Sequence, residues 1–348
     1  MEKCALALEL VGRLSKEGLD FIFKGGTSLM LLFDVPKRLL IDVDILCLEP
    51  LEKLGEVLDR VVTETPFNNW NHQDQRDREA PPTKHFQVYD EPIVPQAHAP
   101  SIQIDVIECD SPYAQLVEQT VRAPFLEQVE EITVPMPSAS CLLGDKLAAF
   151  APSTIGYLYQ PISRSGRETE PRPIKVLKHL FDLSVLAELG TNMADAIASY
   201  ERIFEEQLKF RADVFQQRGI EMTPDLALDD SQDAAFWAAR VGGRRLPENE
   251  NKLIFTQSGI RALRSHLFIE PFAPAQTRLA AGRATLVAEI VRKGSTDFDL
   301  PGVLGAPLDT ESINGTKLES SWADLNTIKG TNTDAYVLWE QAQRLRNI

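Results

Sequence analysis

The chain has 348 residues and a formal net charge of −15, with 43% hydrophobic and 25% charged residues. A chain of this length can bury a substantial core, and we expect two domains. Its longest apolar runs, such as 29–33, are far shorter than the roughly 18 residues that predict a membrane-spanning helix. The negative charge argues against a protein that coats nucleic acid nonspecifically, because that affinity comes mostly from Lys and Arg side chains that neutralise phosphates.

The N-terminal segment and the cysteines indicate a cytoplasmic protein. Residues 1–18 are amphipathic and contain Glu2 and Glu9, unlike a secretory signal. The cysteines are scattered, with no CxxC pair and no histidine at ligand spacing, so neither a zinc site nor a disulfide framework is expected. We expect all of them to be buried thiols.

The first predicted elements are a helix, a strand, a glycine turn and a second helix. Apolar residues at helical spacing predict a helix over 2–16, which Gly18 ends. Residues that favour sheets predict a strand over 21–23. After the glycines, "TSLMLLF" contains strong helix formers, and Thr27 or Ser28 can cap its first turn.

The segment "RLLIDVDILCL" predicts the second strand. The alternation of Ile41, Val43 and Ile45 places Asp42 and Asp44 together on the other face of this strand. Two carboxylates are therefore expected to point the same way.

A polar stretch over 66–100 is predicted to be a long loop, interrupted by a strand near "KHFQVYD". "SIQIDVIECD" then repeats the alternating pattern and inserts Asp105 among apolar residues. Asp105 is a candidate third site carboxylate, although Glu108 or Asp110 could fill that role, and Asp105 could be an ordinary residue on the polar face of a half-exposed strand.

From Ser138 onward the pattern is mainly helical, so the sequence predicts an α+β protein with domains 1–137 and 138–348. A basic, proline-rich linker between the first two of these helices is either a solvated loop or a nucleic-acid contact; its arginines are Arg164, Arg167 and Arg172. A second Asp-x-Asp, formed by Asp297 and Asp299, is predicted to be a turn.

Three carboxylates on neighbouring strands need a common explanation, because burying one ionised carboxylate costs several kcal/mol unless it is paired or holds a metal. Mg²⁺ binds in this way, through a few carboxylates together with substrate phosphates. The Gly25-Gly26 turn before a helix fits the same chemistry, since backbone amides there can approach phosphate oxygens closely.

The stretch "KGGTSLMLLFDVPKRLLIDVDI" resembles the signature of the AbiEii/AbiGii-type nucleotidyltransferase toxins, within the DNA polymerase β-like superfamily. The family usually has a small hydroxyl residue two places before the first aspartate, where this chain has Leu40. The residues that match are Lys24, Gly25, Gly26, Thr27, Leu29, Arg38, Asp42 and Asp44.

Two matches extend the resemblance into the helical half, so that it spans about residues 15–190. Lys146 in "DKLAAFA" resembles the family's helix lysine, and Asp182 in "KHLFDLSVL" resembles its helix aspartate. His179 stands where the family often has an acid. Each residue has a simpler alternative: Lys146 as an exposed helix lysine, and Asp182 as the partner of Lys178 four residues earlier.

The resemblance implies a polymerase β-like nucleotidyltransferase core with a mixed sheet, followed by a mainly helical domain that completes the active-site cleft. It also implies use of an NTP with Mg²⁺, and often a toxin role with an antitoxin protein as partner. Some relatives are similar to enzymes that add nucleotides to tRNA 3′ ends. The metal ligands implied are Asp42, Asp44 and Asp105, and the nucleotide contacts are Lys24, Gly25, Gly26, Thr27, Arg38 and Lys146.

The sequence thus predicts a Mg²⁺-dependent nucleotidyltransferase that transfers NMP to an acceptor, with an RNA such as a tRNA 3′ end favoured. Lys146 would offset charge in the transition state, Asp182 would act as a base or orienter, and Arg38 would orient the aspartates or the phosphates. The alternatives are an enzyme that nucleotidylates a protein or a small molecule, and a catalytically inactive nucleotide-binding regulator.

Overall fold

A mixed sheet and a set of helices make up the computed structural model of this chain. It describes residues 1–73, 82–92, 100–126, 130–159, 170–189, 191–242, 250–268, 271–307 and 313–348. The chain divides into two units. The first contains Met1–Ser138 together with a short segment that begins at His266, and the second contains the helices that follow Ser138.

The first unit is built on a five-stranded sheet with the strand order β1-β2-β5-β4-β3. Strands β2 and β5 are parallel, and the other neighbours are antiparallel. The strands are β1 (Phe21–Lys24), β2 (Val43–Cys47), β3 (Phe67–Gln73), β4 (Lys84–Asp90) and β5 (Ser101–Glu108).

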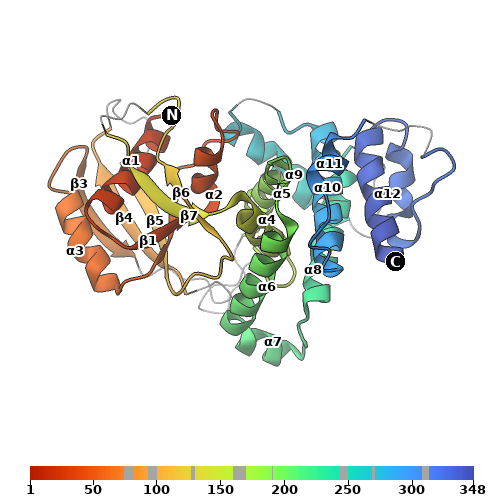
Figure 1. The fold of residues 1–348 in the computed structure, drawn as a ribbon, viewed down its shortest axis with the longest axis horizontal. Helices are drawn as coiled ribbons and strands as arrows, with labels where there is room; N and C mark the ends of the chain where they lie inside the picture. Colours follow the sequence, from red (N-terminus) through yellow and green to blue (C-terminus); the bar gives the residue numbers. More distant parts are fainter. Residues whose placement is uncertain are drawn as a thin grey trace. The chain divides into compact units, whose positions relative to one another are not determined.

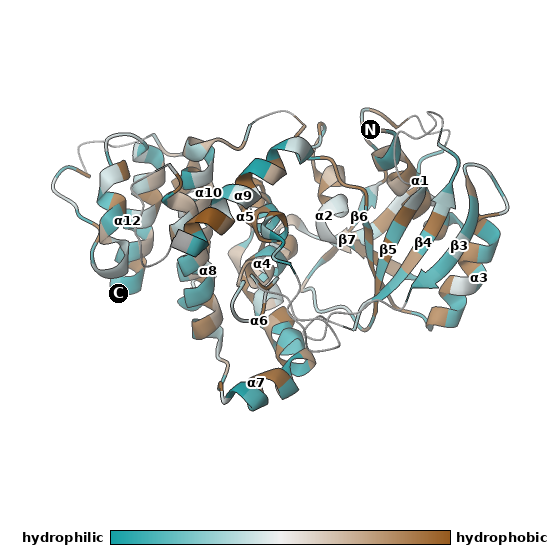
Figure 2. Cartoon of the chain, turned by 180° about the vertical axis from the view of Figure 1, so that it is seen from behind, coloured by the Kyte–Doolittle hydropathy of each residue, from teal (hydrophilic) through white to brown (hydrophobic). Residues whose placement is uncertain are grey.

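One face of the sheet forms the core of this unit, and Figure 1 shows α1 (Glu2–Lys16) and α3 (Leu51–Val61) beside the strands. Val43 and Ile45 of β2 and Ile104 of β5 are fully buried. The alternate positions of β4 and β5 are only partly buried, so these strands have one apolar and one polar face. Figure 2 shows hydrophilic positions recurring along β3, β4 and β5.

Four strands depart from the sequence predictions. The strand predicted over 38–48 is present but shorter, because β2 spans only Val43–Cys47. The predicted loop over 66–100 contains β3 as well as β4. A hairpin of β6 (Leu116–Thr120) and β7 (Thr133–Pro137), which the sequence did not predict, contacts β1.

The helix predicted after the glycine turn is present but short. It consists of α2 (Gly25–Ser28) and one 3-10 segment, η1 (Leu29–Leu32). The predicted capping by Thr27 or Ser28 is wrong, because the helix begins at Gly25 and both hydroxyl residues lie inside it.

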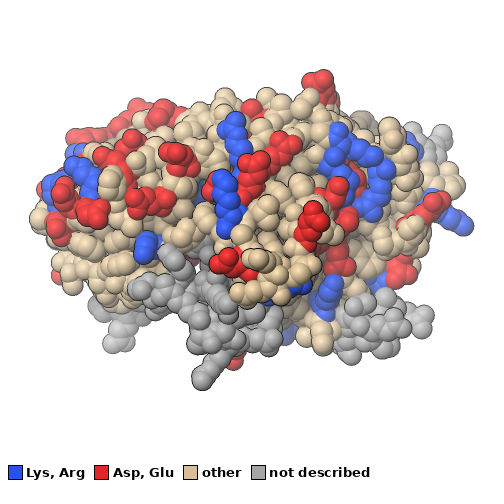
Figure 3. Space-filling view, turned by 90° about the horizontal axis from the view of Figure 1, so that it is seen from below, with Lys and Arg blue, Asp and Glu red and all other residues tan. Residues whose placement is uncertain are grey.

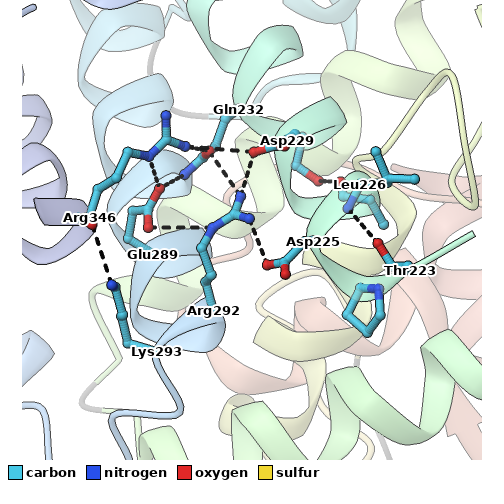
Figure 4. A network of polar contacts seen from close by, with 12 residues as sticks. Thr223, Asp225, Leu226, Asp229, Gln232, Glu289, Arg292, Lys293 and Arg346 are labelled. Carbon is cyan, nitrogen blue, oxygen red and sulfur yellow. Dashed lines mark hydrogen bonds and ion pairs between the residues drawn. The ribbon is translucent and has the colours of Figure 1, made fainter. Parts of the chain in front are cut away.

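The second unit is helical. A polar network connects α12 (Thr333–Asn347) to α10 (Pro274–Arg292) and α8 (Pro224–Ala239), in which Arg346 donates hydrogen bonds to the buried Glu289 and Gln232 (Figure 4). None of the helices among the described residues is long and apolar enough to cross a membrane. The α-helices are α4 (Ala139–Ala149), α5 (Pro173–Ala187), α6 (Met193–Phe210), α7 (Ala212–Arg218), α8 (Pro224–Ala239), α9 (Glu250–Leu263), α10 (Pro274–Arg292), α11 (Leu300–Gly305) and α12 (Thr333–Asn347), and the 3-10 segments are η3 (Arg264–His266) and η4 (Ser320–Ile328). The predicted α+β class, with a mixed sheet followed by helices, is confirmed.

Candidate active site

A row of polar side chains crosses the polar face of the sheet in the first unit. Successive strand pairings place these residues side by side, and side chains of paired residues lie on the same face. Each of them is partly exposed. The row runs from β1 to β3 through Lys24, Asp44, Asp105, His85 and Gln73.

The carboxylate of Asp44 lies directly against the backbone of Gly25. A Cβ atom placed on Gly25 would be 2.1 Å from Asp44 Oδ2, so any side chain at this position would displace the carboxylate. Gly25 also has φ = +77°, a conformation that L-residues with side chains rarely adopt. Two physical requirements therefore favour glycine at position 25: the positive φ, and the close approach of the Asp44 carboxylate.

Gly26 lies against the guanidinium of Arg38, as Gly25 lies against the Asp44 carboxylate. A Cβ atom on Gly26 would be 2.7 Å from Arg38 Nη2, and Arg38 is only 5% exposed. The backbone on either side of Arg38 is held by a segment far away in the sequence: Leu39 N–H donates to His266 O (2.8 Å), and Phe268 N–H donates to Lys37 O (3.1 Å). The sequence carried no signal for this pairing, which depends on tertiary structure.

Asp42 lies just before β2 and is exposed, together with Ile41 (37% exposed). The predicted apolar alternation therefore begins at Val43 and not at Ile41. The hydroxyl of Thr27, which is buried, donates a hydrogen bond to the backbone carbonyl of Asp42. Thr27 thus fixes the backbone of Asp42 next to the glycine turn.

Asp105 is held by two side chains of the same face. His85 Nδ1 lies 2.7 Å and Gln103 Nε2 lies 2.6 Å from Asp105 Oδ1. Asp105 is the strand-to-strand partner of Asp44, so the two carboxylates belong to adjacent positions on parallel strands. The sequence singled out Asp105 but not His85 or Gln103.

Lys146 and Asp182 lie in the second unit, on α4 and α5, where they form a buried ion pair. Lys146 Nζ is 3.7 Å from Asp182 Oδ2, and the two side chains are 4% and 1% exposed. Asp145 lies 4.0 Å from the same Nζ. The alternative that Lys146 is an exposed helix lysine is therefore wrong. Of the basic linker, Arg164 and Arg167 lie outside the described residues, and Arg172 is an exposed residue immediately before α5.

A family model described as "Nucleotidyl transferase AbiEii toxin, Type IV TA system" matches residues 9–252, more than half of the chain. The chain belongs to this family. The resemblance seen in the glycine turn and the aspartates is thereby confirmed, and this AbiEii protein is a nucleotidyltransferase toxin of a type IV toxin-antitoxin system.

Comparison with other proteins adds two distant structural matches. MenT4, a nucleotidyltransferase toxin from Mycobacterium tuberculosis H37Rv, is 15% identical over 97% of this chain and 93% of that chain, with a TM-score of 0.45. An antigenic nucleotidyltransferase-like protein from Paracoccidioides brasiliensis is 15% identical over 66% of this chain and 92% of that chain, with a TM-score of 0.35. No curated protein matches.

The carboxylates of the candidate site fit a divalent cation whose remaining ligands come from the phosphates of the enzyme's substrate. Among the described residues, no group of three or more His, Cys, Asp or Glu side chains is arranged to hold a metal ion. Mg²⁺ usually binds through one or two carboxylates plus substrate phosphates and does not need an all-protein cage. Asp44 meets this requirement, because its Oδ2 lies against the glycine turn where phosphates would approach.

Proposed function

We propose that this AbiEii enzyme uses Mg²⁺ to transfer a nucleotidyl group from an NTP to the 3′ end of an RNA, with tRNA as the acceptor class. The observation that carries the proposal is the contact between Asp44 Oδ2 and the Gly25 backbone. This contact supports the proposal, because a carboxylate, the kind of group that binds Mg²⁺, lies beside a glycine turn, the kind of backbone that binds phosphates. An antitoxin protein is the partner that the family supplies.

Different residues of the first unit would bind the phosphates and the cation. The backbone of Gly25 and Gly26 would bind the phosphates, with Lys24 and Arg38 as nearby positive charges. Asp44 and its strand neighbour Asp105 would hold the cation together with the substrate phosphates; when bound, the cation lowers the pKa of the attacking hydroxyl and stabilises the leaving pyrophosphate. A ligand role for Asp42 remains a prediction. The acceptor oxygen forms the new bond to the α-phosphate as the bond to pyrophosphate breaks. The roles of Lys146 and Asp182 remain predictions based on the family resemblance.

Charge favours recognition of a defined RNA end over broad binding of RNA. The net charge is −15, and Figure 3 shows a face on which Lys and Arg are interspersed with Asp and Glu. Acidic side chains interspersed in this way weaken the attraction of that face for phosphates. A protein or small-molecule acceptor is the second candidate, and the acidic balance is the observation that favours it. A cytoplasmic location remains a prediction.

Incubation with each labelled NTP and total cellular RNA tests the proposal. We expect label in RNA with at least one NTP, and loss of labelling by at least about a hundredfold in Asp44→Ala, because a ligand of the transferring centre is removed. Asp297→Ala is the matched control, since it alters an exposed Asp-x-Asp elsewhere and should label like the wild type. Label in protein would favour the second acceptor class, and no labelling with any NTP would favour an inactive nucleotide-binding regulator.

A further inference from the structure

The two oxygen atoms of Asp105 have different surroundings. His85 Nδ1 and Gln103 Nε2 both contact Oδ1. Because a carboxylate can only accept hydrogen bonds, Nδ1 of His85 carries the hydrogen. No described residue donates a hydrogen bond to Oδ2 of Asp105. The described residues thus hold the Asp105 carboxylate through one of its two oxygens, Oδ1.

We propose that His85 and Gln103 are positioning residues, which fix the Asp105 carboxylate so that Oδ2 is the oxygen that serves the transfer reaction. This inference rests on the proposed function. Two hydrogen bonds to a charged acceptor define the side-chain rotation of Asp105 more tightly than packing alone, because such bonds are short and strong. Outer residues that orient a ligand in this way commonly change metal affinity or activity about tenfold or more when removed.

The arrangement of strands makes this positioning rigid. His85 is the cross-strand partner of Asp105 on β4, and Gln103 lies two residues before Asp105 on the same face of β5. The side chains of His85 and Asp105 are 22% and 25% exposed, so water competes only partly for their contact. A site supported by neighbouring strands holds its geometry better than one supported by loops.

Substitutions that keep or remove the two donors test the inference. His85→Leu and Gln103→Met each remove a donor at similar volume, whereas His85→Asn keeps an amide N–H close to the position of Nδ1. Gln87→Met is the matched control, because Gln87 lies opposite Gln103 on the same face but bonds Tyr89. The measurements are kcat and KM for the NTP, and the Kd for Mn²⁺ by electron paramagnetic resonance in the absence of NTP.

We expect His85→Leu and Gln103→Met each to lower kcat about tenfold, with KM for the NTP changed less than about threefold, and to raise the Kd for Mn²⁺ about tenfold. In His85→Asn, kcat and the Kd for Mn²⁺ should lie within about threefold of the wild-type values. Gln87→Met should leave kcat and the Kd for Mn²⁺ unchanged. Thermal melting identifies any variant that fails to fold. If His85→Leu fails to fold, Gln103→Met still tests the inference.

Wild-type kcat and Mn²⁺ affinity in His85→Leu and Gln103→Met would overturn the inference. So would a His85→Asn protein as impaired as His85→Leu, since the loss would then come from packing of the ring. Asp44→Ala separates this failure from that of the proposed function. If Asp44→Ala abolishes transfer while both donor variants behave like the wild type, only the positioning role is wrong; if Asp44→Ala transfers normally, the proposed function itself is wrong.

Discussion

Gly25 and Gly26 have separate reasons to be glycine. Gly25 has a positive φ and lies against the Asp44 carboxylate, whereas Gly26 lies against the guanidinium of Arg38. One turn therefore accommodates a negative and a positive side chain from the segment that precedes and enters β2. The glycine pair is a packing requirement of the candidate site.

Gly25→Ala should remove nucleotidyl transfer, because the new Cβ displaces Asp44. Gly18→Ala is the matched control: Gly18 also has a positive φ (+81°), but a Cβ there would meet no atom within 4 Å. Both variants should lose about 1–2 kcal/mol of unfolding free energy from backbone strain, but only Gly25→Ala should lose activity. Equal activity of the two variants, measured with labelled NTP, would show that the contact with Asp44 has no role in transfer.

The site residues that could be predicted from the sequence are those whose signal is local. Asp44 and Asp105 stand out because each interrupts an apolar alternation. The exposed position of Asp42 was missed because "LLIDVDI" reads as one strand, although pairing with β5 begins only at Val43. His85 could not be identified, because its contact with Asp105 depends on the register between β4 and β5.

At the scale of elements, β3 escaped prediction because it has little buried surface. In β3, "FNNWNHQ", only Phe67 is fully buried, and the strand forms the edge of the sheet. Its polar composition resembles that of a loop. The mainly helical character of the chain after Ser138 was predicted, because helices such as α4, α5 and α6 carry apolar residues at helical spacing.

Removing one partner of the pair formed by Lys146 on α4 and Asp182 on α5 should destabilise the second unit, whether or not the pair acts in catalysis. Lys146→Met or Asp182→Asn alone should lower the unfolding free energy of the second unit by about 3–5 kcal/mol, because each removes one partner of a buried ion pair. The double variant Lys146→Met/Asp182→Leu should regain much of this loss. Urea titration measures the stability, and transfer by the stable double variant shows whether the charges are also needed for activity; wild-type transfer would contradict their predicted roles.

The C-terminal helix α12 should contribute to stability and not to transfer. Arg346 bonds Glu289 (2.7 Å), lies 4.3 Å from the ring centroid of Trp322, and comes after the part of the chain that the family model matches. Arg346→Met should lower the melting temperature by roughly 2–6 °C, corresponding to about 1–2 kcal/mol, with kcat unchanged.

Lys53→Met is the control for this prediction, because the side chains of Lys53 and its partner Glu56 are 39% and 66% exposed and both lie in α3. Such pairs contribute less than about 1 kcal/mol. Differential scanning calorimetry distinguishes the two variants. An equal effect of both, or a loss of kcat in Arg346→Met below its melting temperature, would contradict this assignment.

At the scale of the whole molecule, an acidic chain of the AbiEii family combines a mixed sheet with a helical unit, and the family match extends through both. The first unit contains Asp44, Asp105 and the glycine turn, and the second contains Lys146 and Asp182. The acceptor must be found in cells: sequencing of RNA 3′ ends should reveal added nucleotides on expression of the wild type but not of Asp44→Ala.

The most direct test of the central claim is calorimetric titration of a non-hydrolysable NTP analogue, with Mg²⁺ or with EDTA, into the wild type and Asp44→Asn. Because Asp44 lies against the turn that would bind the phosphates, the wild type should bind at least about tenfold more tightly with Mg²⁺ than with EDTA. Asp44→Asn should lose that difference while keeping its fold. Mg²⁺-dependent binding by Asp44→Asn equal to that of the wild type would contradict the account.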